Sequence, residues 1–196
     1  MAHLLLIDAL NLIRRLYAVQ ERPYLPVTDE VAEGTKTQII RNTENMLRQA
    51  LARLQQELAP SHAVLVFDGH NSLWRKTLYA EYKANRKPMP TILADALPGL
   101  QQCAKSLGFD SVQQDEYEAD DIIASIAVKL AQHGQQVTIV STDKGFLPLL
   151  SQHIHIYDAF ARQHQTEEAV QQKFGVSTAQ LVRYWSLVGD STNNSP

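Results

Sequence analysis

The sequence predicts an α/β domain with a central, mostly parallel sheet flanked by helices. Short apolar runs alternate along the chain with segments of helical periodicity, a pattern that predicts strands joined by right-handed helical crossovers. The first three runs are continuously apolar, which is typical of strands covered on both faces. The expected strands are residues 3–7, 63–67, 137–141 and 154–158.

Helical spacing separates these strands. Residues 37–58 and 120–133 place apolar side chains at intervals of three and four, and Pro60 and Gly134 follow them as stop signals. A third helix is expected to end at Gly108. The alternation of strands and helices therefore continues through most of the chain.

Length and composition exclude several classes of protein. The 196 residues favour one domain, or one domain with an appendage. No uninterrupted apolar run is long enough to span a membrane, the start does not resemble a signal peptide, and one cysteine excludes a disulfide framework, so we expect a cytoplasmic protein. The glycine-rich phosphate motifs and the G-x-S-x-G elbow are missing from the sequence, which argues against nucleotide-binding and serine-hydrolase functions.

The distribution of charge is uneven. The net charge is −3, yet residues 75–87 carry five cations and one acid. This block lies in the second of two expected long loops, residues 21–34 and 69–91. A basic block on an acidic body indicates a surface that binds phosphate. A solvated helix face that binds nothing is the alternative.

Acidic residues are expected to meet at one edge of the sheet. Three follow strands and three open the helix at 120–133, and the carboxyl ends of parallel strands are where ligands bind. These six residues are Asp8, Asp68, Asp143, Glu118, Asp120 and Asp121. Each one alone is also a plausible helix cap. Together they would repel one another unless a cation neutralised them, and oxygen ligands favour Mg²⁺ or Mn²⁺.

Six motifs in order carry a family resemblance. They are DALN from Asp8, VFD (66–68), YKANR (82–86), YEADD (117–121), STDKG (141–145) and LVGDSTNN (187–194). Together they resemble the 5′-nuclease superfamily, which contains the flap endonucleases and the 5′-exonuclease domains of bacterial DNA polymerase I. The resemblance covers the whole chain.

The resemblance implies a PIN-like 5′-nuclease fold. Residues 1–175 would form the α/β nuclease domain, with a helical arch around 70–95. Residues 176–196 would begin a helix–three-turn–helix module that binds duplex DNA and continues beyond this chain. The implied activity is that of a metal-dependent 5′-flap endonuclease and 5′–3′ exonuclease, which hydrolyses phosphodiesters of branched DNA with the help of Mg²⁺ or Mn²⁺.

The same resemblance assigns roles to individual residues. The metal ligands would be the six acids and Asp190, and the catalytic cations would be Lys83 and Arg86. DNA contacts are expected from Arg14, Arg15, Arg75, Lys76, Tyr82 and Lys87, with Tyr82 able to stack on a base. Backbone carbonyls of Leu187, Val188 and Pro196 would contribute to a K⁺ site if the module is complete.

The sequence departs from the family pattern at two positions. Many relatives carry aspartate where this chain has Gly145 and Asn193, so the second metal site is expected to be weakened. A branched-DNA-binding protein with vestigial catalysis therefore stays as an alternative. A PIN-like ribonuclease is a further alternative, against which the YKANR motif and the Gly-Asp segment at Asp190 argue.

Overall fold

The computed structural model describes residues 2–25, 31–70 and 74–189. Its centre is a six-stranded sheet in which β1 to β5 are parallel and β6 is antiparallel to β5. The strands are β1 (His3–Asp8), β2 (His62–Phe67), β3 (Asp110–Gln113), β4 (Gln136–Val140), β5 (Ile154–Asp158) and β6 (Gln163–His164). The predicted α/β class and parallel sheet are confirmed.

The strand order β3-β2-β1-β4-β5-β6 places β1 at the point where the winding of the sheet reverses. After β1 the chain builds outward through β2 and β3, and then returns to the other side of β1 with β4. Such a reversal leaves a crevice at the carboxyl ends of the two flanking strands, which is where open α/β sheets bind ligands. Asp8 ends β1 at this point.

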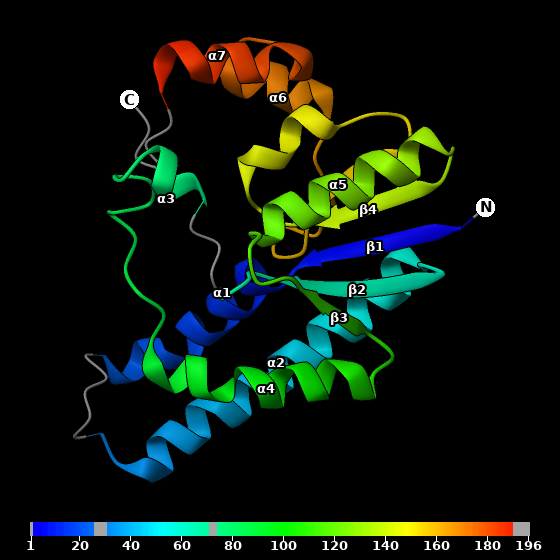
Figure 1. Ribbon diagram of the computed structural model, residues 1–196. Helices are drawn as coiled ribbons and strands as arrows, with labels where there is room; N and C mark the ends of the chain where they lie inside the picture. The colour runs from blue at the N-terminus through cyan, green and yellow to red at the C-terminus, as the bar shows by residue number, and fades with distance from the viewer. Residues whose placement is uncertain (1, 26–30, 71–73, 190–196) are drawn as a thin grey trace.

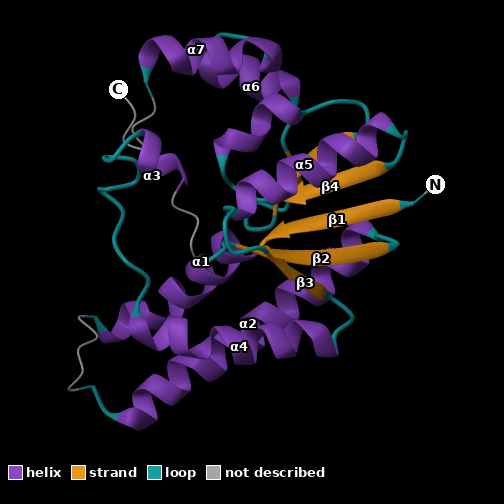
Figure 2. Cartoon of the chain, in the orientation of Figure 1, coloured by secondary structure: helices purple, strands orange, loops and turns teal. Residues whose placement is uncertain are grey.

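Helices cover both faces of the sheet, as Figures 1 and 2 show. The α-helices are α1 (Ala9–Glu21), α2 (Glu33–Leu58), α3 (Trp74–Leu78), α4 (Thr91–Ser106), α5 (Ala119–Gln132), α6 (Glu167–Phe174) and α7 (Leu181–Val188). Three 3₁₀ segments, η1 (Arg22–Tyr24), η2 (Lys144–Leu149) and η3 (Thr178–Gln180), complete the described elements. Helices α1, α2 and α4 lie on one side, and α5 lies on the other.

Alternating side chains of β1 divide the core into two layers. Leu5 and Ile7 are fully buried among residues of α1, α2 and α4, whereas Leu6, between them, is fully buried against α5. Successive residues of a strand point to opposite faces, so a strand covered on both faces must be apolar at every position. This is the physical reason for the continuous apolar runs.

Two of the strands were not predicted from the sequence pattern. The edge strand β3 is exposed at all four positions, Asp110–Gln113, and β6 has two residues, both exposed. Neither strand needs an apolar run, so neither produced the pattern on which the other predictions depended. Predicted boundaries of the remaining strands and of α2 and α5 agree with the structure to within a few residues.

The expected helical arch contains little helix. Of residues 70–95, those described form the five-residue α3, a run of turns, and the first residues of α4. Lys83 has a left-handed backbone with φ of 54°, and prolines at 88 and 90 precede α4. In Figure 1 the segment between α3 and α4 crosses the carboxyl edge of the sheet. We call residues 74–90 the arch segment.

Within residues 2–25, 31–70 and 74–189, no helix combines the length and the apolar character needed to cross a lipid bilayer.

Candidate active site

A pocket opens where the carboxyl ends of β1, β2 and β4 meet the start of α5. Four carboxylates and six cations line it, and we call it the acidic pocket after the carboxylates. Its lining residues are Asp8, Leu10, Asn11, Arg14, Arg15, Asp68, Lys83, Arg86, Asp120, Thr142, Asp143, Lys144 and Lys173. Segments more than 160 residues apart in the chain therefore meet at the predicted edge of the sheet.

Asp8 is buried and tightly held at the end of β1. Its Oδ1 accepts a hydrogen bond from the backbone amide of Asn11 at 3.2 Å, so the side chain caps helix α1. Its Oδ2 accepts from the hydroxyl of Ser141 at 2.9 Å. The capping role considered for Asp8 is therefore real, and it coexists with a place in the acidic pocket.

Asp143 repeats this arrangement after β4. Its Oδ1 accepts from the amide of Gly145 at 2.8 Å and caps the 3₁₀ segment η2. Its own amide donates to the hydroxyl of Ser141 at 3.0 Å. Ser141 thus bridges Asp8 and Asp143 across the reversal between β1 and β4, a role that the sequence analysis did not assign.

Asn11 and Thr142 form a second bridge beside the first. The amide nitrogen of Asn11 donates to the hydroxyl of Thr142 at 3.0 Å, and its amide oxygen accepts from the Thr142 backbone at 3.2 Å. Both residues line the acidic pocket. They lie in the DALN and STDKG motifs, so the signal was present, but their contact is visible only in three dimensions.

Asp120 comes from the first turn of α5 and faces the other acids. Burial raises the pKa of Asp120 to about 7, and the charges of Asp8 and Asp143 add to the shift. Burial likewise raises the pKa of Asp8 to about 6, against two hydrogen bonds that lower it. The pocket therefore holds carboxylates whose ionised form is destabilised by their surroundings, an environment that favours a bound cation.

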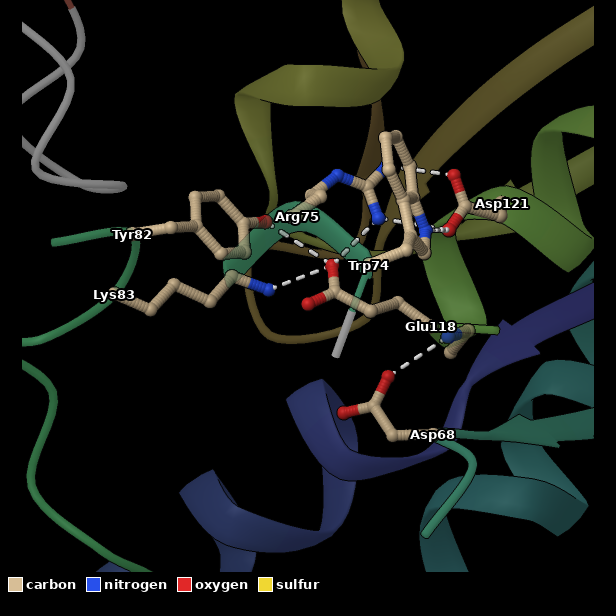
Figure 3. A network of polar contacts seen from close by, with 8 residues as sticks. Asp68, Trp74, Arg75, Tyr82, Lys83, Glu118 and Asp121 are labelled. Carbon is tan, nitrogen blue, oxygen red and sulfur yellow. Dashed lines mark hydrogen bonds and ion pairs between the residues drawn. The ribbon is translucent and has the colours of Figure 1, made fainter. Parts of the chain in front are cut away.

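The predicted set of acids does not stay together. Glu118 and Asp121 are absent from the acidic pocket's lining and instead bind the arch segment (Figure 3). Glu118 Oε2 accepts from Arg75 Nη1 at 3.1 Å, from Tyr82 at 3.1 Å and from Lys83 Nζ at 3.0 Å. Its side chain is buried, so these three donors replace water around the carboxylate.

Asp121 forms a two-pronged ion pair with Arg75. The guanidinium nitrogens lie 2.7 and 2.6 Å from its two oxygens, and the indole nitrogen of Trp74 donates to Oδ2 at 3.4 Å. Burial would raise the pKa of Asp121, but the bonds from Arg75 outweigh it and the pKa is lowered. Asp121 thus points to α3 while its neighbour Asp120 points to the acidic pocket.

The predicted cations occupy several environments. Lys83 and Arg86 line the acidic pocket with Arg14 and Arg15, whereas Lys76 and Lys87 are exposed and do not line it. Arg14 donates to the carbonyls of Lys87 and Pro88 at 3.3 and 3.4 Å, and the Arg15 guanidinium lies 4.2 Å from the ring of Phe160. Lys144 and Lys173 also line the pocket, and the sequence analysis assigned them no role.

Tyr82, expected to stack on a base, is engaged within the protein. Its hydroxyl bonds Glu118, and the ammonium of Lys83 lies 5.0 Å from its ring centre. The side chain is partly buried, and Figure 3 shows it beside Lys83. Tyr82 therefore shares Glu118 as a partner with Arg75 and Lys83.

The donor set of the acidic pocket suits a hard divalent ion. Among the residues that the structure describes, no three His, Cys, Asp or Glu side chains stand close enough together to ligate one ion directly. Mg²⁺ is usually held by one or two carboxylates and keeps several waters, so a pocket of spaced carboxylates fits it better than a closed cage would. Ligation partly through water is the arrangement consistent with this geometry.

The remaining site predictions lie at the end of the chain. Leu187 and Val188 occupy the last turn of α7, where the backbone amide of Gly189 donates to the carbonyl of Trp185. Asp190, Asn193 and Pro196 lie outside the described residues. The proposed K⁺ site and the ligand role of Asp190 therefore stay predictions.

The chain is similar in sequence to a known family of nucleases. Residues 3–175 match the family described as 5′–3′ exonuclease, N-terminal resolvase-like domain. A protein named flap endonuclease Xni from Colwellia psychrerythraea is 53% identical over 196 residues, covering 98% of this chain and 68% of that protein. Its namesake from Vibrio cholerae is 42% identical over 196 residues, covering 99% and 70%.

Solved structures share the fold at low sequence identity. A bacteriophage T5 5′-exonuclease with bound zinc ions gives a TM-score of 0.76 at 18% identity, over 98% of this chain and 68% of that one. A T5 D15 flap endonuclease in complex with DNA and metal ions gives 0.66 at 17% identity, over 98% and 68%. From the family match and its relatives, this chain belongs to the 5′–3′ exonuclease family and is a nuclease of the flap endonuclease type.

Proposed function

We propose that the acidic pocket hydrolyses phosphodiesters of branched DNA at 5′ flaps, with a divalent metal ion as cofactor. The observation that carries the proposal is the pairing of four carboxylates with six cations in one pocket. A phosphodiester in this pocket would meet carboxylates able to hold a cation and basic side chains able to bind its neighbouring phosphates. The DNA-bound state of a structural relative supports the choice of substrate.

Mg²⁺ or Mn²⁺ is the metal that the pocket would take, because its charged donors are oxygen atoms. Asp8, Asp68, Asp120 and Asp143 would hold it, directly or through water. A divalent ion bound there lowers the pKa of an attacking water and neutralises charge on the phosphate. Solved relatives contain bound metal ions, which supports a divalent cofactor.

Lys83 and Arg86 are the cations that we assign to the scissile phosphate. Both line the acidic pocket, and Lys83 is held there by its ion pair with Glu118. Lys83 would move from Glu118 to a phosphate oxygen when DNA enters, which exchanges one charge-assisted hydrogen bond for another. Arg14, Arg15, Arg75, Lys76, Tyr82 and Lys87 are then assigned to binding or to supporting the arch segment.

Glu118 and Asp121 have a different role in this arrangement. They join α5 to the arch segment through Arg75 and Lys83. A contact of either acid with the metal would require it to give up an ion pair first. We therefore assign them to positioning the arch segment, while the ligand role implied by the family resemblance stays a prediction.

A weakened second metal site is part of the proposal. Asp143 is available to it, and Asp190 is expected to contribute, but Gly145 supplies no carboxylate. We also infer a K⁺ site at the carbonyls of Leu187, Val188 and Pro196 and a cytoplasmic location, both from the sequence. Vestigial catalysis on a branched-DNA-binding protein is the second candidate function, and the absence of a side chain at Gly145 favours it.

Cleavage of a fluorescent 5′-flap substrate in Mg²⁺ tests the proposal. We expect release of the flap by wild-type protein and none by Asp120→Asn. Flap binding without cleavage would support the second candidate function. Cleavage of single-stranded RNA with no action on the flap would instead identify a PIN-like ribonuclease and overturn the proposal.

A further inference from the structure

A second pocket is lined by Asp121, and we call it the aromatic pocket. It takes this name from two of its lining side chains, Trp74 and Tyr117, which are 43% and 46% exposed. Its lining residues are Trp74, Val112, Gln114, Tyr117, Asp121, Ile122, Ser125 and Ile126. They come from α3, from the region of β3 and the loop after it, and from the start of α5. The proposed function does not use this pocket.

The aromatic pocket adjoins the acidic pocket along α5. Asp120 lines the acidic pocket and Asp121 lines the aromatic one. Their Cα atoms are one peptide unit, about 3.8 Å, apart. Arg75 stands at the boundary, because it contacts Asp121 and also Glu118, which in turn binds Lys83 of the acidic pocket (Figure 3).

The chemistry of the aromatic pocket suits a nucleobase. The guanidinium of Arg75 lies 4.3 Å from the centre of the Trp74 ring, so this aromatic side chain is already held beside a cation. Gln114 and Ser125 add hydrogen-bonding groups, and Ile122 and Ile126 add apolar surface. Flat aromatic rings with a few polar groups are the usual platform for unpaired bases, and nearby cations bind the connecting phosphates.

Charged groups around the aromatic pocket are of both signs. Among the described residues, Asp121 is the one carboxylate that lines the aromatic pocket, and its two-pronged pair with Arg75 neutralises it. Lys76 follows on the same helix α3 and is exposed. Asp115 and Glu116, which directly precede Tyr117, are exposed as well, so acids and cations both surround this part of the surface. Stacking on the aromatic rings, and not charge, therefore carries the inference.

The pocket is also held in shape by its backbone. The amide of Gly69 donates to the carbonyl of Tyr117 at 2.9 Å, and the side chain of Gln113 donates to the carbonyl of Asp68 at 2.8 Å. A Cβ atom on Gly69 would lie 2.0 Å from the carbonyl oxygen of Gln114, so the close approach requires glycine. A platform fixed in this way loses little conformational freedom on binding.

We propose that the aromatic pocket binds one unpaired nucleobase of the single-stranded 5′ flap, next to the phosphodiester held in the acidic pocket. The inference rests on the proposed function, since it takes the flap as the ligand. The base stacks on Trp74 and Tyr117, and Gln114 and Ser125 offer hydrogen-bonding groups at its edge. The pocket thereby adds a flap-binding subsite that reads the presence of a base and not its identity.

Abasic substitution along the flap tests this subsite. Binding of the full chain to flap substrates with one abasic position at a time is measured in EDTA, so that cleavage does not interfere. We expect one or two positions at which losing the base weakens binding by about 5- to 150-fold, the range for one base on an aromatic residue. Tyr117→Leu should weaken binding of the intact flap similarly and remove the penalty at those positions.

Matched variants separate stacking from other effects. Trp74→Phe and Tyr117→Phe keep an aromatic ring and should bind nearly as wild type, whereas Trp74→Leu should resemble Tyr117→Leu. Trp74→Phe also controls for the lost hydrogen bond to Asp121. Val128→Ala, at an exposed apolar residue of the same helix α5 outside the pocket, should leave binding unchanged.

Two outcomes overturn the inference. The first is that abasic substitution weakens binding at no position, and the second is that the penalty persists undiminished in Tyr117→Leu. In either case the pocket holds no base, and a protein segment becomes its next candidate occupant. The proposed function is tested separately, by cleavage of the intact flap in Mg²⁺. If wild-type protein cleaves flaps but shows no base-dependent binding, the proposed function stands and the flap-binding subsite is refuted.

Discussion

Asp68 accepts a hydrogen bond from the backbone amide of Ala119 at 2.7 Å. The carboxylate at the end of β2 thus caps the first turn of α5 from another element, in place of Glu118, whose side chain makes no capping bond. The positive end of the helix dipole favours an acid at this place. The same contact fixes the start of α5, and with it the direction in which Asp120 and Asp121 point.

This double role of Asp68 predicts different effects for two substitutions. Asp68→Asn keeps an oxygen that can accept from Ala119, so the cap should persist while cleavage falls strongly. Asp68→Ala removes the cap and should also lower stability by about 0.5–2 kcal/mol. Denaturant unfolding and flap cleavage of both variants check this. Equal stability of the two variants would contradict the capping role.

Asp120→Asn should abolish cleavage and stabilise the metal-free protein. The pKa of Asp120 is raised to about 7 in the fold, so the ionised carboxylate destabilises the native state at neutral pH. Converting a shift of this size to free energy gives a gain on the order of a few kcal/mol above pH 7. Thermal unfolding in EDTA measures it, and an unchanged or lower stability at pH 8 would count against the crowded pocket.

The same shifts set the pH dependence of stability without metal. Raised pKa values mean that the folded protein binds protons more tightly than the unfolded chain does. The stabilising contribution of Asp8 and Asp120 is therefore present below about pH 4 and is lost as pH rises through about 6 to 7. The advantage of Asp120→Asn over wild type should grow across this window. An advantage that is constant between pH 4 and 8 would show that the native pKa is not raised.

Arg75→Gln should loosen the arch segment, because Arg75 contacts both Asp121 and Glu118. We expect faster hydrogen exchange of the amides of α3, corresponding to about 1–3 kcal/mol of local stability lost with the charge-assisted bonds. Lys76→Gln is the matched control, since it removes the same charge from an exposed neighbour. Similar exchange in the two variants would mean that net charge, and not the ion pair, holds the segment.

Gly69→Ala should destabilise the protein, because the added Cβ would lie 2.0 Å and 2.5 Å from the carbonyl oxygens of Gln114 and Asp115. The backbone must shift to relieve this contact, at a cost of about 1–3 kcal/mol. Gly99→Ala offers a control of opposite sign. It lies in α4 with nothing within 4 Å of its Cβ position, so alanine should stabilise by about 0.5–1 kcal/mol. Denaturant unfolding curves of both variants measure these changes in unfolding free energy, and a Gly69→Ala variant as stable as wild type would contradict the close contact.

Gly145→Asp tests the weakened second metal site. A Cβ at residue 145 would lie 3.2 Å from Asp143 Oδ1, so a new carboxylate would stand close to the acidic pocket. Metal-free protein should become less stable through repulsion, and should gain more stability than wild type from added Mn²⁺ or Mg²⁺. Gly145→Asn is the matched neutral control. Overlapping metal titrations of the Asp and Asn variants would refute a ligand position at residue 145.

Much of the fold was predictable from local sequence pattern. The continuous apolar runs of β1, β2 and β4 follow from burial on both faces, and the stop signals at Pro60 and Gly134 mark where helices end. The edge strand β3 was not predictable in this way, because exposed residues carry no such pattern. The arch segment was expected to be helical from resemblance, yet its left-handed Lys83 and its prolines leave room only for the short helix α3.

By itself, the sequence determined that acids would gather at the carboxyl edge of a parallel sheet, since that follows from where each strand ends. Which acids share a pocket was decided by the tertiary structure. Asp120 and Asp121 are neighbours in the chain, but successive residues of a helix differ by about 100° in direction. The docking of α5 on Asp68 turns Asp120 to the acidic pocket. Arg75, 46 positions away in the chain, holds Asp121 beside the aromatic pocket, a pairing that no local pattern specifies.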